Sequence, residues 1–149
     1  MKGSTLAWLL AFAVAAALVW QGHRWHDRLQ GSAMLRQVEL VSISAASSGR
    51  APRNILPAHL ELLRRAAELD PAEVGIPIAR ANQFVLFGDP RGAIPAYRQA
   101  MAMEPKAVIY FGLGRALLAS GDLEEARRNF RTAVRLDPTL AGQIPEGGR

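Results

Sequence analysis

The feature that most restricts the fold is a pattern that occurs twice in the second half of the chain, 33 residues apart. Five positions, running from a glycine to a proline, recur at this constant spacing. They are Gly88, Ala93, Tyr97, Ala100 and Pro105, and then Gly121, Ala126, Phe130, Ala133 and Pro138. Pro71 also precedes Pro105, by 34 residues. Periods of this size indicate small helical units that bury a core only by stacking on one another.

The second copy, from Ala107 to Pro138, predicts two helices joined by a tight turn. The first helix has one apolar face at three- and four-residue spacing. Its members are Tyr110, Leu113, Gly114 and Leu117. After the turn, Asp122 is placed to cap the second helix, and Glu125 stands three residues later, as a capping box requires. Gly114 and Ala126 are small enough to let the two backbones approach.

These residues resemble the tetratricopeptide repeat, whose pattern is an aromatic, Leu-Gly, an apolar residue, Ala, an aromatic and a closing proline. The matching positions are Tyr110, Leu113-Gly114, Leu117, Ala126, Phe130 and Pro138. The resemblance covers residues 57–138. It implies an all-α solenoid of about two and a half helical hairpins, with a role in binding other proteins and no enzymatic activity.

The upstream repeats depart from this pattern. Residues 57–71 resemble only the second helix of a repeat, with Pro57 at the helix start, where its missing N–H costs nothing. In the next repeat Pro77 replaces the first aromatic and is expected to start its helix late. Arg80 replaces the leucine and must turn outward or find a partner. Pro95 lies inside the second helix and is expected to bend it.

The N-terminal segment is hydrophobic. Residues Thr5 to Trp20 carry no charge, and as a helix they would reach about 24 Å. This predicts an uncleaved signal anchor, so that the predicted fold class is all-α with a single N-terminal transmembrane helix before the repeats. The alternatives are a signal peptide cleaved near Ala15-Ala16-Ala17 and a buried helix. Orientation is open, but the short tail led by Lys2 favours export.

Four regions follow from these assignments. Residues 1–21 are the predicted membrane helix, 22–56 a juxtamembrane helix and loop, 57–138 the repeats and 139–149 a tail. Within the second region, residues 22–46 either continue the membrane helix or form a degenerate first helix of the array. Residues Ser47 to Asn54 have the Gly, Pro and Ser content of a loop. The predicted location is a bacterial inner membrane, single-pass, with periplasmic repeats and a cytoplasmic orientation as the alternative.

The charge distribution argues against a nucleic-acid partner. The formal net charge is +5, but residues 1–56 hold six Lys/Arg and two Asp/Glu, whereas residues 57–149 hold twelve and eleven. A nucleic-acid binder should carry a basic stripe on its folded domain, and here the repeat region is nearly neutral. The basic surplus beside the hydrophobic segment suits anionic lipid headgroups. The stripe Arg127, Arg128, Arg131 and Arg135 is most simply a solvated helix face.

No catalytic, cofactor or metal site is predicted. The chain has no cysteine, which excludes a disulfide framework and a thiolate metal site. His23 and His26 are three residues apart, but two ligands without a third do not make a zinc site. His59 stands alone on a leucine-rich helix. Glu124 and Glu125 are explained by helix capping and the helix dipole.

The resemblance also implies a partner-binding groove, because the first helix of each repeat lines the concave side in this family. The positions are Ile78, Asn82, Val85, Phe111, Arg115 and Leu118. This mainly apolar set suits a protein partner that presents a peptide or an amphipathic helix, oriented by Asn82 and Arg115. The alternative is that these residues only pack inside a small array.

Self-association is a further expectation, because about three repeats are needed for independent stability and the tail lacks a covering amphipathic helix. The outer face near Phe130, Val134 and Leu136 is the first place expected to meet a second copy. The predicted function is a membrane-tethered adaptor or assembly factor of a bacterial cell-envelope complex. The alternative is a permanent structural or accessory subunit, for example in cytochrome c maturation, secretion or polysaccharide synthesis.

Overall fold

The computed structural model describes residues 3–48 and 55–149, and all the regular secondary structure of these residues is helical. The α-helices are α1 (Gly3–Ser48), α2 (Ile55–Leu69), α3 (Gly75–Leu86), α4 (Pro90–Met103), α5 (Ala107–Ser120) and α6 (Leu123–Leu136). Two short 3-10 helices follow, η1 (Pro138–Gln143) and η2 (Glu146–Gly148). The predicted all-α hairpin array is therefore confirmed. Of the predicted loop, Ser47 and Ser48 end α1, and the remainder lies outside the described residues.

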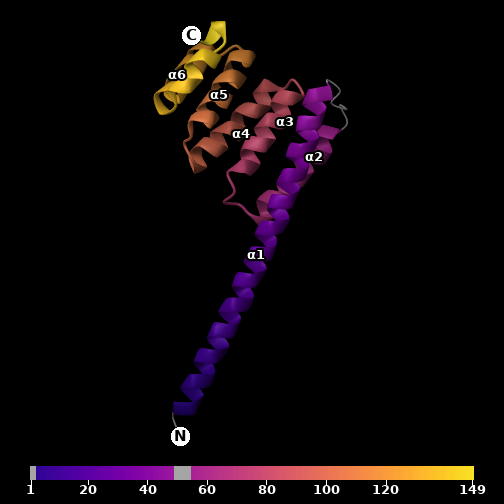
Figure 1. Ribbon diagram of the computed structural model, residues 1–149, viewed down its shortest axis with the longest axis vertical. Helices are drawn as coiled ribbons and strands as arrows, with labels where there is room; N and C mark the ends of the chain where they lie inside the picture. Colours follow the sequence, from indigo (N-terminus) through magenta and orange to yellow (C-terminus); the bar gives the residue numbers. More distant parts are fainter. Residues whose placement is uncertain (1–2, 49–54) are drawn as a thin grey trace.

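Successive helices stack as three hairpins, α1/α2, α3/α4 and α5/α6 (Figure 1). The C-terminal half of α1 packs against α2 and α3, while its N-terminal half projects from the stack as a single long rod. The C-terminal half of α1 thus supplies the first helix of the first hairpin, one of the two roles that the sequence allowed for residues 22–46. The predicted domain boundaries remain predictions, and α1 runs without interruption past residue 21.

The prediction of a transmembrane helix is wrong. Among the described residues, no helix has both the length and the apolar character needed to cross a membrane. The physical reason is that the uncharged run from Thr5 to Trp20 is only 16 residues long before it gives way to Gln21, His23 and Arg24. This run is shorter than the roughly 20 residues that a spanning helix requires. This finding overturns the predicted fold class with an N-terminal signal anchor. It also overturns the predicted single-pass inner-membrane location with periplasmic repeats. Membrane contact through Thr5–Trp20 has no support.

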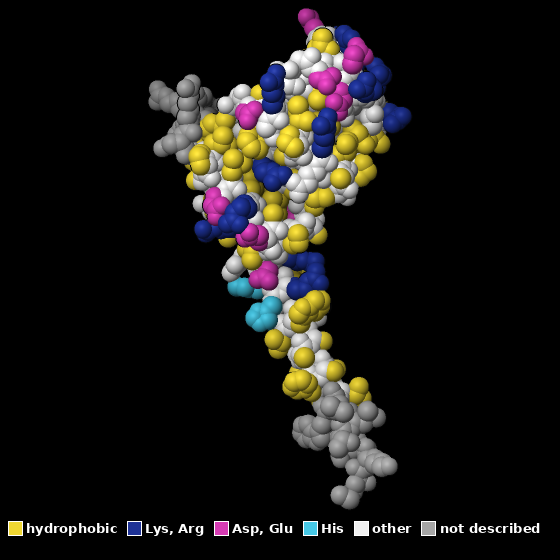
Figure 2. Space-filling view, turned by 180° about the vertical axis from the view of Figure 1, so that it is seen from behind, with side chains coloured by type: hydrophobic (Ala, Val, Ile, Leu, Met, Phe, Trp, Pro, Cys, Tyr) yellow, Lys and Arg dark blue, Asp and Glu magenta, His cyan; other side chains and the backbone are white. Residues whose placement is uncertain are grey.

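The projecting part of α1 nevertheless exposes large apolar side chains. Leu10, Phe12, Val14, Leu18, Val19 and Trp20 are all exposed, and the space-filling view shows hydrophobic side chains on this rod (Figure 2). Arg24 lies 4.9 Å from the centroid of the Trp20 ring, a cation–π distance. Arg28 reaches toward Asp70, at 3.9 Å, where the rod meets the stack.

The core consists mostly of alanines with one large aromatic in each of α4 and α6. Among the described residues, eight alanines are at most 1% exposed: Ala66, Ala81, Ala93, Ala96, Ala100, Ala116, Ala126 and Ala133. Tyr97 and Phe130 fill the space between the closely approaching helices. A Cβ atom added at Gly114 would lie 2.9 Å from the Phe130 ring, so the predicted close approach at Gly114 is confirmed. A second, smaller cluster around Leu63 and Val38 joins α1, α2 and α3.

The turns form as the sequence predicts, with one difference. Asp122 accepts a hydrogen bond from the backbone N–H of Glu125 at 3.1 Å, and Gly121 ends α5 with a φ of 94° that favours glycine. The Glu125 carboxylate, however, does not close a capping box. It accepts two hydrogen bonds from Arg98 of α4, at 2.8 and 2.9 Å, and so links two hairpins. The Glu125 side chain therefore pairs with Arg98, which is distant in sequence, instead of with the nearby backbone N–H of Asp122.

The unusual residues of the middle hairpin are accommodated. Pro77 lies in the first turn of α3, where its missing N–H leaves no bond unmade, so the helix begins at Gly75 rather than late. Arg80 donates to the Gln99 side chain of α4, which is the pairing that its position required. Pro95 stands inside α4, which continues to Met103, and its ring is exposed. The bend expected at Pro95 remains a prediction.

A buried chain of polar side chains joins the first hairpin to the second. His59 Nδ1 lies 2.8 Å from Gln83 Oε1, and Gln83 Nε2 donates to Ser42 Oγ at 2.6 Å. Because the Gln83 amide oxygen can only accept, His59 Nδ1 is the donor in this pair. His59 and Gln83 are only 4% and 1% exposed. Helices α1, α2 and α3 are therefore held in register by hydrogen bonds as well as by apolar contact.

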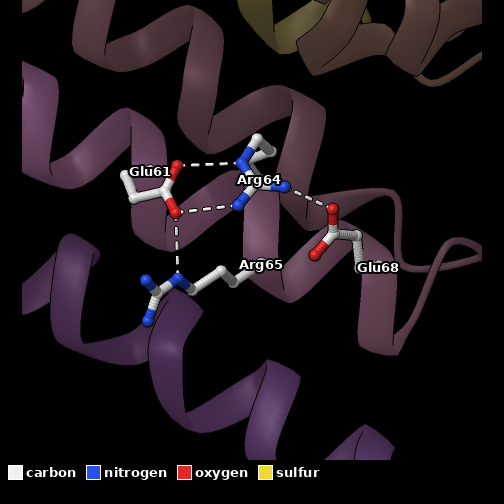
Figure 3. Close-up of polar contacts among 4 residues, drawn as sticks. All are labelled: Glu61, Arg64, Arg65 and Glu68. Carbon is white, nitrogen blue, oxygen red and sulfur yellow. Dashed lines mark hydrogen bonds and ion pairs between the residues drawn. The ribbon is translucent and has the colours of Figure 1, made fainter.

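The opposite surface of α2 carries a salt-bridge network (Figure 3). Glu61 accepts hydrogen bonds from Arg64 and Arg65 at 2.8 and 2.9 Å, and Arg64 also pairs with Glu68. The two arginines hold the pKa of Glu61 down, from 4.5 to about 2. All four side chains are exposed or partly exposed, so the network adds little to stability in salt.

The C-terminal tail covers the last hairpin, which differs from the expectation of an open end. A Cβ atom at Gly148 would lie 2.4 Å from the Phe130 ring, and Arg127 Nε donates to the Arg149 carbonyl at 3.0 Å. Asp137 caps η1 by accepting from the Thr139 backbone at 3.0 Å. Phe130 is consequently 1% exposed and is not available to a second copy, although Leu136 remains exposed.

The buried polar chain makes one prediction about stability. Replacing Gln83→Leu should lower the free energy of unfolding by about 1–3 kcal/mol, because the His59 donor is left buried without an acceptor. Gln37→Leu on the exposed side of α1 is the matched control and should change stability by less than about 0.5 kcal/mol. Urea unfolding followed by circular dichroism measures both, and equal stability of the two variants would contradict the role of Gln83.

The Glu61 network makes a prediction about pH. Because the folded pKa of Glu61 lies below its usual value, its contribution is complete above about pH 4.5 and is lost as the pH falls toward 2. The melting temperature of the wild type should exceed that of Glu61→Gln slightly at neutral pH. The difference should shrink below pH 4.5 and with added salt. A difference that grows on acidification would contradict the assignment.

Candidate functional site

The predicted groove positions gather around one hollow. It has a volume of about 420 Å³ and lies between α3, α4 and α5. Its lining residues are Ile78, Asn82, Val85, Leu86, Tyr97, Val108, Phe111, Gly112 and Arg115. Five of the six predicted residues are in this set. We call this region the α3–α5 hollow. That it binds a partner is a prediction.

Leu118 is the predicted residue that lies elsewhere. It is partly buried and packs against the core cluster next to the C-terminal tail. Its Cδ1 atom would be 3.3 Å from a Cβ atom added at Gly147. The tail therefore uses Leu118 as a packing contact, which the spacing of residues along α5 could not reveal.

The lining residues divide into a floor and a rim. Ile78 and Phe111 form part of the floor, since both are partly buried and pack against the core. The Phe111 ring meets Phe130 edge to face, with centroids 5.5 Å apart. Val85 and Val108 form an apolar rim, at 38% and 60% exposed. The rim residues can contact another molecule without any change in the fold. The floor residues line the hollow and also stabilise the core.

Tyr97 connects the core to the polar part of the hollow. Its ring is buried beneath α5, and its hydroxyl donates to Asn82 Oδ1 at 2.7 Å. Burial raises the pKa of Tyr97, an effect that outweighs the opposing influence of Arg115, so the hydroxyl remains a donor at neutral pH. This bond fixes the Asn82 amide with its oxygen toward Tyr97. The Asn82 amide nitrogen is thereby left as the donor offered to the hollow.

Gly112 makes this arrangement possible. A Cβ atom there would lie 2.6 Å from the Tyr97 ring and 2.9 Å from its hydroxyl oxygen. Only a glycine lets the Tyr97 side chain cross under α5 and reach Asn82. The sequence did not indicate four of the lining residues, which are Leu86, Tyr97, Val108 and Gly112. The signal available was Gly112 itself, a glycine in mid-helix, which indicates close packing.

Arg115 supplies the charge of the hollow. Its side chain is exposed on α5, and within residues 10–44 and 55–149 it makes no ion pair. A free guanidinium beside an apolar surface favours a carboxylate or a carbonyl oxygen of a ligand. Among the described residues, no group of three His, Cys, Asp or Glu side chains is placed to hold a metal ion. The chemistry offered is therefore recognition by apolar contact, one amide and one cation.

Stacked helical hairpins with a hollow lined by their first helices define an α-helical repeat protein. Residues 78–141 match the family model described as tetratricopeptide repeat. This segment contains α4, α5, α6 and most of α3, and so includes the helices that form the α3–α5 hollow. The match supports the resemblance over that segment. A comparison with curated proteins finds no match.

Two solved structures are similar in fold. One is the first TPR of Spaghetti (RPAP3) bound to HSP90 peptide SRMEEVD, which is 17% identical with a TM-score of 0.61 over 74% of this chain and 82% of that chain. The other is TTC0263, a thermophilic TPR protein in Thermus thermophilus, which is 26% identical with a TM-score of 0.53 over 57% of this chain. This chain spans 44% of the Thermus protein.

The contact of Gly112 with Tyr97 yields a prediction. Gly112→Ala should destabilise the protein by about 1–2 kcal/mol, because the overpacking cost exceeds the gain in helix propensity. Gly22→Ala is the matched control, since a Cβ atom there meets nothing within 4 Å and alanine is the better helix former. Thermal unfolding measures both variants, and the two substitutions should shift the melting temperature in opposite directions. If Gly112→Ala left the stability unchanged or raised it, as Gly22→Ala is expected to do, the Tyr97 ring would move aside freely and the prediction would be wrong.

Proposed function

We propose that this chain is a protein–protein interaction module that captures a peptide segment of a partner in the α3–α5 hollow. The observation that carries the proposal is the combination of an exposed apolar rim with one oriented amide and one exposed cation. Val85 and Val108 offer contact area, while Asn82 and Arg115 offer a donor and a positive charge. Ligand sites commonly have this composition, mostly apolar with a few placed polar groups.

The similar fold of the RPAP3 domain, which is bound to a peptide, supports this type of ligand. At 17% identity the likeness extends to the fold alone, so the HSP90 peptide is not transferred to this chain. The support is architectural: stacked hairpins of this kind present a continuous surface built from several helices. A short segment can then be held at several points along its length.

The competing interpretation is that the lining residues only stabilise the repeat stack. It fits the floor, because Phe111 packs on Phe130. It does not fit the rim, because a side chain that is 60% exposed, like that of Val108, contributes little to burial within the chain. We therefore base the proposal on the rim and the polar groups.

An adaptor or assembly factor is the form of this function that we favour, with a structural or accessory subunit of a larger complex as the alternative. The two differ in whether the partner exchanges. Arg115→Glu and Val108→Asp change exposed positions, so the protein should remain folded. An adaptor should then lose its partner while its own abundance is unchanged, whereas a structural subunit should be degraded together with its complex.

The direct test uses peptides selected from a random phage-displayed library against the full-length protein. Val108→Asp should weaken their binding at least about tenfold, since it places a charge on the apolar rim. Leu136→Asp, an exposed apolar position on α6, is the control and should leave binding unchanged. Fluorescence anisotropy of the selected peptides measures both. If no peptide is enriched, or if Val108→Asp binds as well as wild type, the proposal is wrong.

A further inference from the structure

A second hollow lies next to the first. It has a volume of about 260 Å³ and lies between α1 and α3, and we call it the α1–α3 hollow. Its lining residues are Glu39, Ser42, Ile43, Ala79, Asn82 and Gln83. Asn82 lines both hollows, so they meet at this side chain. Together they form one surface that runs across the first helices of all three hairpins, from α5 through α3 to α1.

The two ends of this surface carry opposite charges. Arg115 stands on α5 at one end, and Glu39 stands on α1 at the other. Both side chains are exposed, and neither makes an ion pair within residues 10–44 and 55–149. In contrast, Arg28, Arg64, Arg65, Arg98 and Arg127 are each paired with a carboxylate. The unpaired charges of the surface thus lie at its two ends.

The space between the charges is apolar. Ile43 is 67% exposed beside Glu39, and Val85 and Val108 are exposed near Arg115. Between them, Asn82 presents its amide nitrogen, because its oxygen is held by Tyr97. Ser42 and Gln83 are already hydrogen-bonded to each other at the edge of the α1–α3 hollow and are not free to specify a ligand. A ligand that crosses this surface meets a cation, an apolar stretch with one donor, and an anion.

From this we infer that the partner segment is an extended peptide of mixed charge, with an acidic side chain over α5, apolar side chains in the middle and a basic side chain over α1. The inference rests on the proposed function and adds which charge of the peptide lies over which helix. Electrostatic complementarity of this kind sets orientation and excludes wrong partners. A uniformly acidic segment is repelled at Glu39, and a uniformly basic one is repelled at Arg115.

The size of the effect follows from exposure. Ion pairs at exposed positions are weak and screened by salt, so each end should change affinity by about three- to tenfold rather than abolish binding. The apolar contacts carry the affinity, and the charges decide the orientation. Low ionic strength should therefore sharpen the discrimination between peptides of opposite charge order.

The test compares random peptides displayed on phage and selected on the full-length wild type with those selected on Arg115→Glu, Glu39→Lys and the double variant. Wild type should enrich peptides with one acidic and one basic residue separated by apolar residues. Each single reversal should weaken a selected peptide about three- to tenfold. The double variant should enrich the reversed charge order. Arg131→Glu and Glu146→Lys are exposed controls outside both hollows and should bind like wild type.

The outcomes separate this inference from the proposed function. If peptides bind and are lost with Val108→Asp but show no charge order, or if Glu39→Lys has no effect, the charge inference is overturned while the binding function stands. If no peptide is enriched on the wild type, the charge inference and the proposed binding function are both wrong. Circular dichroism of each variant verifies the fold, which is expected to persist because both altered side chains are exposed.

Discussion

The structure depends on the close packing of aromatic rings against glycines across neighbouring helices. The Phe130 ring of α6 lies against Gly114 of α5, and the Tyr97 ring of α4 lies against Gly112, which is also in α5. A methyl group at either glycine would be 2.9 Å or less from the ring. These two contacts set the separation of α5 from its neighbours on both sides. Interiors are packed densely, so this spacing fixes the surface that the helices present together.

The candidate site is a consequence of that packing rather than an addition to it. Tyr97 fills the core with its ring and orients Asn82 with its hydroxyl, so one residue connects stability to recognition. Phe111 has a similar double role, since it lines the hollow and also packs against Phe130. The exposed residues Val85, Val108 and Arg115 are not constrained in this way. Specificity can therefore vary at the rim while the floor is retained.

The first hairpin is held by a different interaction. Ser42, His59 and Gln83 come from three helices and form one buried hydrogen-bonded chain, and its polar groups would be costly to bury unpaired. None of the three follows the repeat pattern, and they are far apart in sequence. For this reason the sequence pattern shows His59 only as an isolated histidine on a leucine-rich helix. The chain locks α1 beside α3 and thereby brings Glu39 and Ile43 next to Asn82.

The sequence alone determined the repeat, its helices, the cap at Asp122 and five of the nine residues that line the α3–α5 hollow. These features follow from local spacing, because periodicity and capping act within one or two turns of helix. Only the tertiary structure decided the rest. Glu125 pairs with Arg98 instead of closing its box, Leu118 is taken up by the tail, and α1 serves as a repeat helix rather than as the expected membrane span. Each of these outcomes depends on contacts between residues distant in sequence, and no local pattern encodes them.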